Sequence, residues 1–263
     1  MATISAVEVN SVQSLMREIE NSGLTAQNHG HVRVWFRGHS REGWPLQPGV
    51  YRGRLEGVSE PDRWNVERHL TQDFLVQSAG LRHGNETDAG LYFLQQHYGM
   101  PTRLLDWTNN PLAALFFASI ADPRSDGELF MLDAYQFQTA SGTVRSFLGR
   151  DFRGIATAGH PVFESALVPI FRWKPDVFPS FIIPVRPSYS DVRISSQRSC
   201  FTFHVPDQFV IDLAANPTLR VYRVPMSAKP AIIKELRLLG VDQFRVFGDL
   251  SSLSTTLKRD YDV

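Results

Sequence analysis

The order of hydrophobic and polar residues along the chain predicts several amphipathic helices. Hydrophobic residues recur at intervals of three and four in these segments, so they would share one face of a helix. The segment PLAALFFASIA is instead apolar on nearly every side, which predicts a helix buried in the core. The predicted helices span residues 9–22, 62–81, 87–98, 111–121 and 229–239, with a short last helix that begins near Asp249.

Strands are predicted where β-branched and aromatic residues dominate short runs. Helices prevail in the first half of the chain and strands in the second, and residues 140–178 give the weakest pattern. This order favours an α+β fold, with a mixed, mainly antiparallel sheet and flanking helices, over a regularly alternating parallel sheet. The predicted strands span residues 31–37, 102–106, 128–134, 180–186, 200–205 and 219–224.

Composition places the chain among ordinary folded proteins. Its 263 residues are 43% hydrophobic and 21% charged, which suits one large domain over residues 1–263. Lys and Arg together number 27, as do Asp and Glu. The zero balance argues against general attraction to nucleic acids or membranes, but it leaves room for a local basic site.

Location is predicted from what the sequence lacks. The single cysteine, Cys200, cannot form an internal disulfide and suits a reducing compartment. The first residues do not have the pattern of a signal peptide, and no stretch approaches the about 20 apolar residues of a membrane span. We therefore expect a cytoplasmic protein without a membrane partner.

A first candidate site is the segment Trp35-Phe36-Arg37-Gly38-His39-Ser40, at the end of a predicted strand. The guanidinium of Arg37 can bind phosphate or carboxylate with two parallel hydrogen bonds. Gly38 would let a ligand approach the backbone closely. The alternative is structural: Arg37 pairs with a carboxylate of the protein, and Gly38 makes a turn.

A second candidate site is the polar and aromatic segment from Gln95 to Pro111, between two predicted helices. The apolar helix that follows places this segment against the core, where Arg103 and Asp106 would need partners. We expect Arg37, Arg103 and Asp106 to converge in one pocket. The segment serves either as a ligand site or as a polar staple that fixes the loop.

A third polar segment, from Arg193 to His204, leads into a predicted strand and contains Gln197. Cys200 lies in that strand and is predicted to be a small core residue rather than a nucleophile. Other site types lack support: the phosphate-binding glycine loops, the HExxH helix and the G-x-S-x-G elbow are absent, and the eight histidines are scattered. No metal site is predicted.

These three segments together resemble the FRG domain family, named for its Phe-Arg-Gly signature, here Phe36-Arg37-Gly38. The longer match runs from Gln96-His97-Tyr98-Gly99 through Thr102-Arg103-Leu104-Leu105-Asp106-Trp107-Thr108 to Asn110-Pro111. The resemblance covers about residues 30–258, with the helix over 9–22 attached to this core. Ser199 stands where the family usually has glycine, and Gly248 where it usually has proline.

The motif order of this family is similar to that of ADP-ribosyltransferases, which implies an ADP-ribosyltransferase-like core and NAD as the substrate. By this resemblance Arg37 would hold the pyrophosphate, Tyr98 would stack on a base and Thr108 would bind a ribose. Ribosyl transfer also needs a carboxylate near the ribose. Gln197 stands where such enzymes carry Glu, and Gln197 and Asp106 are the candidate catalytic residues. Asp106 would supply the carboxylate, with Glu164 and Asp191 as outside candidates. The residues implied to contact NAD are Arg37, Gly38, His97, Tyr98, Thr102, Arg103 and Thr108.

Two functions from different classes stay open at this point. The first is an enzyme that transfers ADP-ribose to a nucleic acid or protein, or hydrolyses NAD, in bacterial anti-phage defence or a toxin system. The second is a module that binds a nucleotide, nucleic acid or phage component without catalysis, and a purely structural domain is a third reading. A carboxylate placed at the ribose would distinguish the first from the second.

Overall fold

The computed structural model describes residues 7–24, 33–82, 84–140, 154–172, 182–188, 198–206, 210–212 and 216–262. Within these residues, eight strands form one open sheet in the order β1-β8-β4-β2-β3-β7-β6-β5. The strands are β1 (Val7–Glu8), β2 (Val34–His39), β3 (Leu104–Thr108), β4 (Gly127–Asp133), β5 (Ala156–Thr157), β6 (Ile183–Arg186), β7 (Ser199–Phe203) and β8 (Leu219–Val224).

The sheet is mixed and mainly antiparallel, as the sequence predicted. The two outermost pairs, β1 with β8 and β5 with β6, are parallel, and the strands between them pair antiparallel. Strands β1 and β5 contain only two residues each, too few to produce an alternating pattern that sequence could reveal. All six predicted strands are present, with ends shifted by a few residues.

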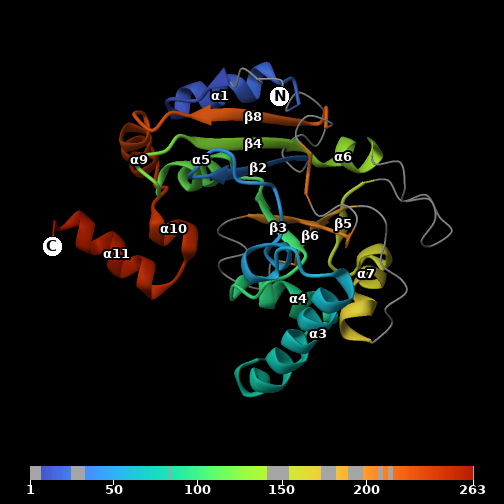
Figure 1. Cartoon of the computed structure of the whole chain (residues 1–263). Coiled ribbons are helices and arrows are strands. Elements are labelled where there is room, and N and C mark those ends of the chain that lie inside the picture. The colour runs from blue at the N-terminus through green and yellow to red at the C-terminus, as the bar shows by residue number, and fades with distance from the viewer. Residues whose placement is uncertain are drawn as a thin grey trace.

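Helices cover the sheet (Figure 1). Three of them, α6, α7 and α10, were not predicted from the sequence. The helices are α1 (Val12–Asn21), α3 (Glu60–Gln77), α4 (Asp88–His97), α5 (Pro111–Ser119), α6 (Ala134–Ala140), α7 (Pro161–Phe171), α9 (Lys229–Leu238), α10 (Gln243–Phe247) and α11 (Leu250–Asp260), with short 3-10 helices η1 (Gly49–Tyr51), η2 (Gly53–Leu55) and η3 (Ala79–Leu81). In the described part of the chain, no helix is long and apolar enough to cross a membrane.

Two groups of helices pack on the same face of the sheet. Phe36 of β2 and its partner Thr108 of β3 project to this face. Alternate residues of a strand point to the same side, so Leu104, four positions before Thr108, projects to this face too. Phe36 belongs to the core formed with α1, α5 and α9, whereas Leu104 belongs to the core formed with α4 and α7. A boundary between two helical groups therefore crosses this face where β2 meets β3.

Helix α5 is the central helix of the first group. Asn110 caps it by accepting a hydrogen bond from Leu112 N, and Pro111 occupies its first turn. Leu115 and Phe116 are fully buried, as predicted for this apolar segment. The helix packs mainly on β2 and to a lesser extent on β4, which lies beside β2 in the sheet.

Gly38 lets α5 approach the sheet more closely than any larger residue would allow. A Cβ atom at this position would lie 1.9 Å from Ala114 O and 2.6 Å from Ala118 N, both in the backbone of α5. We expect Gly38→Ala to lower the free energy of unfolding by about 1–3 kcal/mol, the usual effect of overpacking a core. Denaturant unfolding measures the change.

Gly90 in α4 is the matched control for Gly38→Ala. A Cβ atom there would lie 3.5 Å from Thr87 Oγ1, at ordinary contact distance, so Gly90→Ala is expected to be neutral or stabilising through helix propensity. Equal effects of the two substitutions would contradict the close packing of α5 on Gly38.

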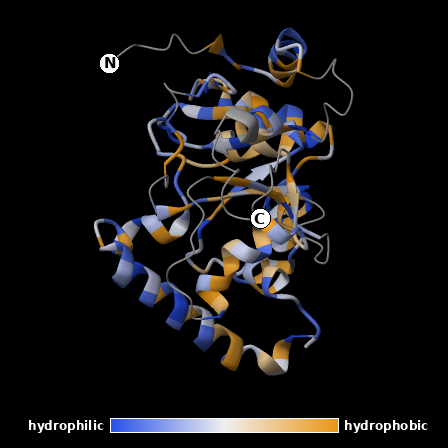
Figure 2. Ribbon diagram, turned by 90° about the vertical axis from the view of Figure 1, so that its right-hand side faces the viewer, coloured by the Kyte–Doolittle hydropathy of each residue, from blue (hydrophilic) through white to orange (hydrophobic). Residues whose placement is uncertain are grey.

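Helix α3 buries a face different from the apolar face that its sequence predicted. Hydrophobic residues such as Val66 were expected to face the core, yet Val66 is exposed. The helix instead buries polar and charged side chains, and Figure 2 shows it as a mainly hydrophilic helix. The buried residues are Arg63, Trp64, Glu67, Arg68 and Thr71. Their partners explain this burial, because they include the buried Arg103, which directly precedes β3.

Candidate functional site

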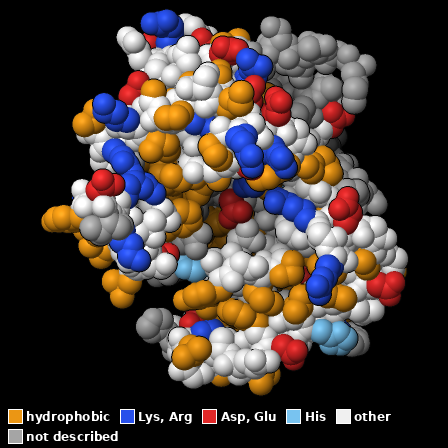
Figure 3. Space-filling model, turned by 60° about the vertical axis from the view of Figure 1, so that its left-hand side comes forward, with side chains coloured by type: hydrophobic (Ala, Val, Ile, Leu, Met, Phe, Trp, Pro, Cys, Tyr) orange, Lys and Arg blue, Asp and Glu red, His pale blue; other side chains and the backbone are white. Residues whose placement is uncertain are grey.

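A cleft of about 830 Å³ opens at the boundary between the two helical groups. Its floor comes from β2 and β3, one wall from α5 and the other from the loop that follows α4. Figure 3 shows a hollow between the upper and lower parts of the molecule, with hydrophobic, basic and acidic side chains around it. The lining residues are Phe36, Arg37, Gly38, Gly49, Arg52, Gln96, His97, Tyr98, Gly99, Met100, Pro101, Leu104, Asp106, Trp107, Thr108, Ala114 and Phe117.

The cleft lies where two neighbouring strands separate. Strand β2 pairs with β4 along all six of its residues, but it pairs with β3 only at Phe36 and Thr108. Past this point the side chain of Arg37 replaces the missing backbone partner: its Nη1 donates to the carbonyl oxygen of Asp106 at 2.6 Å. A guanidinium thus fills the gap between the strands.

Arg37 is held at two of its three nitrogens. Nε donates to His39 Nε2 at 2.9 Å, and Nη1 makes the bond to the Asp106 carbonyl. Among the residues that the structure describes, Nη2 has no hydrogen-bond partner. The side chain is 15% exposed and lines the cleft. Its orientation is fixed by the protein while donor capacity is left for an anion in the cleft.

The electrostatics of this pair are consistent with those bonds. Burial, followed by the nearby charge of Arg37, lowers the pKa of His39 to about 3. The imidazole is therefore neutral at physiological pH and can accept the Nε–H of Arg37. Burial, with a contribution from Arg52, lowers the pKa of Arg37 to about 10, and Asp106 opposes this shift. Arg37 stays cationic at neutral pH.

Asp106 brings the one carboxylate among the described residues that line the cleft. It is the exposed position in an otherwise buried strand, and its side chain is 58% exposed. Its Oδ2 accepts a hydrogen bond from Gln96 Nε2 at 2.9 Å and lies 3.8 Å from Arg37 Nη1. Thr102 in turn donates to Gln96 Oε1. This chain from Thr102 to Gln96 to Asp106 orients the carboxylate.

Arg52 supplies a second cation that the sequence analysis did not single out. Its Nε donates to Gln47 O, which leaves the terminal nitrogens toward the cleft. The 3-10 helix η1 carries it there, because Val50 N donates to Thr102 O and fixes this turn against the loop after α4. Burial lowers the pKa of Arg52, and Asp106 opposes the shift. Two cations and one carboxylate give the cleft a positive balance.

Aromatic and apolar side chains form the rest of the wall. Tyr98 is 68% exposed at the rim, and its ring lies 4.8 Å from that of His97 between centroids. Gly99 adopts a φ of +77°, which ends α4 as the sequence predicted. Phe117 of α5 faces the cleft from the other wall. A flat, partly apolar group could bind between these surfaces.

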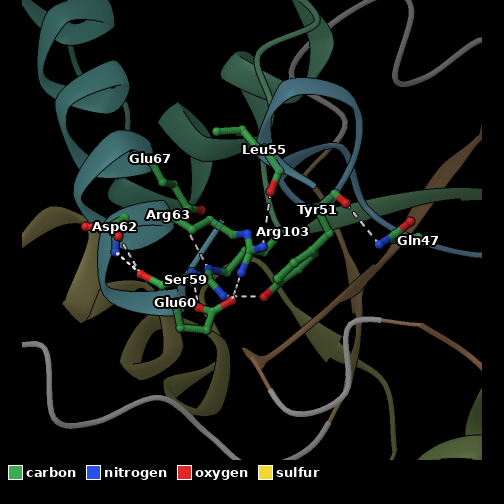
Figure 4. Close-up of polar contacts among 9 residues, drawn as sticks. All are labelled: Gln47, Tyr51, Leu55, Ser59, Glu60, Asp62, Arg63, Glu67 and Arg103. Atoms are coloured by element: carbon green, nitrogen blue, oxygen red, sulfur yellow. Dashed lines mark hydrogen bonds and ion pairs between the residues drawn. The ribbon is translucent and has the colours of Figure 1, made fainter. Parts of the chain in front are cut away.

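Arg103 does not join Arg37 and Asp106, so the predicted convergence of all three is wrong. It is fully buried beneath the cleft wall, and it satisfies its charge with residues of α3 (Figure 4). Nε donates to Glu67 at 2.8 Å, Nη1 donates to Tyr51 OH and Nη2 lies 3.3 Å from Glu60. The need for partners was predicted correctly, but they came from a helix whose face was read as apolar.

This buried cluster shapes the cleft indirectly. Burial lowers the pKa of Arg103, but the charges of Glu67, Tyr51 and Glu60 outweigh it and raise the pKa above its ordinary value. Tyr51 ends η1, and the next residue is Arg52. The Arg103–Tyr51 hydrogen bond therefore anchors the turn that presents Arg52.

Comparison with known families bears on this cleft. Residues 32–127 match the FRG domain. The chain carries an FRG domain. The matched segment contains every described residue that lines the cleft, from Phe36 to Phe117. No curated protein matches the chain, and no solved structure matches it.

The other predicted residues fall into three groups within this FRG protein. Gly38, His97, Tyr98 and Thr108 line the cleft, although Thr108 Oγ1 accepts a hydrogen bond from Asn110 N. Thr102 is buried and acts on the cleft through Gln96. The last group lies away from the cleft or outside the described residues: Glu164 of α7 is not among the lining residues, and the catalytic candidate Gln197 and the outside candidate Asp191 lie outside the described residues.

No group of three or more His, Cys, Asp or Glu side chains in the described part of the FRG protein could hold a metal ion. Cys200 is fully buried in β7, in agreement with its predicted core role. Burial raises the pKa of its thiol to about 12, so it is protonated at neutral pH.

Proposed function

We propose that the cleft binds NAD and that the protein cleaves its nicotinamide–ribose bond, either to transfer ADP-ribose to an acceptor or to hydrolyse NAD. The observation that carries the proposal is the meeting of Arg37, Arg52 and Asp106 in one cleft within the FRG domain. The cleft offers partners for the pyrophosphate, for one of the two rings and for the ribose that is cleaved from nicotinamide.

The pyrophosphate matches the two arginines. Arg37 has a guanidinium fixed at Nε and Nη1, with Nη2 unpaired among the described residues, and Arg52 adds a second cation to the cleft lining. Arginine binds phosphate oxygens with two parallel hydrogen bonds, and such bonds are stronger than neutral ones. The nicotinamide or adenine ring matches the aromatic and apolar wall formed by Tyr98, His97 and Phe117.

The carboxylate of Asp106 matches the demands of ribosyl chemistry. The bond between the ribose C1′ and the nicotinamide nitrogen breaks, its electron pair leaves with nicotinamide, and positive charge develops on the ribose. A carboxylate beside the ribose stabilises that charge. Asp106 is exposed to the cleft and oriented by Gln96, and water or an acceptor hydroxyl then attacks C1′ and loses a proton.

Release of nicotinamide from NAD is the direct test, and Arg37→Lys is the informative variant. We expect Arg37→Lys to reduce turnover nearly as much as Arg37→Ala. The compact ammonium of lysine cannot reproduce the planar fork that reaches His39, the Asp106 carbonyl and a phosphate from separate nitrogens. Chromatographic measurement of released nicotinamide, with ADP-ribose affinity from calorimetry, gives the result.

Arg54→Lys serves as the control, because Arg54 is exposed on the neighbouring η2 and does not line the cleft. It is expected to leave turnover unchanged. Full activity of Arg37→Lys would contradict the proposed role of Arg37 in binding NAD.

One observation favours a second candidate function, a module that binds the nucleotide without cleaving it. Asp106 is the single carboxylate on the described lining, and it already accepts a hydrogen bond from Gln96. A protein of this kind would bind ADP-ribose or NAD with dependence on Arg37 and Arg52 while releasing no nicotinamide. The same two measurements therefore distinguish the two functions.

A further inference from the structure

A second groove, which we call the basic groove, lies at the far end of α5 from the cleft. It has a volume of about 510 Å³, and α5, α9, α11 and the loop after α5 form it. The described lining has four basic side chains and no acidic one. The lining residues are Ser119, Ile120, Pro123, Met226, Lys229, Pro230, Ile233, Lys234, Arg237 and Arg259. We propose that the basic groove binds the phosphodiester backbone of a single-stranded nucleic acid.

One of the four cations is already used by the protein. Lys229 is buried, and its Nζ donates to three backbone carbonyls: Ser40 O at 2.6 Å, Ala121 O at 3.1 Å and Asp122 O at 3.0 Å. These bonds account for all three of its hydrogens. Lys229 therefore neutralises the carbonyl groups beyond the end of α5, which would otherwise repel an anion.

The other three cations remain available. Lys234 and Arg237 are three positions apart on α9, so both lie on the face that Ile233 also presents to the groove. They are exposed and have no hydrogen bond or ion pair within the described part of the chain. Arg259 of α11 has one long contact, to Gln243 Oε1 at 3.5 Å. Figure 3 shows basic side chains along the side of the molecule where α9 and α11 lie.

Ser119 gives an independent indication of a ligand. The residue is 6% exposed, and its Oγ has no hydrogen-bond partner within the described structure. A serine in a helix usually returns its hydroxyl to a carbonyl one turn earlier, and Ser119 makes no such bond. Buried polar groups are normally paired. A phosphate oxygen in the basic groove would supply the missing partner.

The set of donors favours nucleic acid over other anions. Lys, Arg and Ser side chains are the usual contacts to phosphate oxygens, which fix a strand without reading its sequence. The groove lining has no aromatic residue on which a base could stack, so we expect binding to rest on phosphate contacts and to depend strongly on salt. The carboxylates of Asp122 and Asp126 lie close enough to Lys229 to interact with its charge. The charge of Asp126 is also paired with Arg223, at 3.3 Å.

The groove also lies close to the cleft along α5. Ala114 and Phe117 face the cleft, and Ser119 and Ile120 face the basic groove. At about 1.5 Å of rise per residue, Phe117 and Ser119 lie roughly 3 Å apart along the helix axis. Binding in the basic groove does not depend on the NAD proposal.

Fluorescence anisotropy of a labelled single-stranded DNA of about 16 nucleotides, without NAD, tests the proposal. Wild type is expected to bind with a salt dependence whose slope falls by about 0.7 for each cation removed in Lys234→Ala, Arg237→Ala and Arg259→Ala. Arg237→Ala should weaken binding about tenfold, as for loss of a charged hydrogen bond. Ser119→Ala should weaken binding while keeping or raising the melting temperature, because it removes an unpaired buried hydroxyl.

Lys258→Ala is the matched control, since Lys258 neighbours Arg259 on α11, carries the same charge and does not line the basic groove. It should leave the slope unchanged. The proposal fails if wild type does not bind the DNA, or if Lys258→Ala and Arg259→Ala weaken binding equally. It also fails if Ser119→Ala has no effect, or if polyglutamate or anionic lipid vesicles compete as well as unlabelled DNA.

Discussion

Replacement of Arg103 by methionine is expected to lower the free energy of unfolding by about 3–5 kcal/mol, the usual effect of breaking a buried ion pair. Arg103 is fully buried, and Glu67 beside it is 2% exposed. Methionine would fill most of the volume. Among the described residues, the Glu67 carboxylate would then keep one hydrogen-bond donor, the hydroxyl of Tyr92. Denaturant unfolding followed by circular dichroism measures the loss.

An exposed ion pair provides the comparison for Arg103. Arg172 lies 3.1 Å from Asp88, with 67% of its side chain exposed, so Arg172→Met is expected to cost less than about 1 kcal/mol. The double variant Arg103→Met, Glu67→Leu should recover part of the loss, because no buried charge is then left alone. A near-neutral Arg103→Met would mean that water or another group replaces the arginine.

Substitution of Asp106 by asparagine is expected to separate binding from turnover. Asparagine keeps the shape and can still accept the hydrogen bond of Gln96, but it removes the charge that would stabilise the ribosyl cation. Nicotinamide release should fall roughly 100- to 1,000-fold, the range for loss of one electrostatic group at a transition state. ADP-ribose affinity should hold or increase, because the negative charge beside Arg37 and Arg52 is gone.

Asp73→Asn is the control for that variant, since Asp73 is exposed on α3 and does not line the cleft. It should change neither quantity. If Asp106→Asn mainly lowers the melting temperature and leaves turnover intact, Asp106 is a structural residue. The binding function would then be the better account of the cleft.

Local patterns were sufficient for most of the fold. Asn110 and Pro111 marked the start of α5, Gly99 marked the end of α4, and the six longer strands followed their β-branched and aromatic runs. Strands β1 and β5 were not predicted, because two residues are too few to show an alternating pattern. Helix α7 contains Pro169, which obscures a helical pattern.

The candidate site was only partly predictable, for a physical reason. Arg37 and Asp106 belong to recognisable motifs, and they do meet. Arg52 reaches the cleft because Tyr51 is anchored to Arg103, a contact between residues far apart in the sequence. Arg103 was misplaced for the same reason: a pattern shows that a buried charge needs a partner, but it does not show which side chain the fold brings to it.

The position of β4 affects whether the segment that matches the FRG domain can fold apart from the rest of the chain. The match to the FRG domain ends at residue 127, the first residue of β4, while β7 pairs with β3 from outside the match. A fragment limited to residues 32–127 would leave the outer edges of both β2 and β3 without neighbouring strands. Unpaired strand edges recruit other chains. Such a fragment would tend to aggregate.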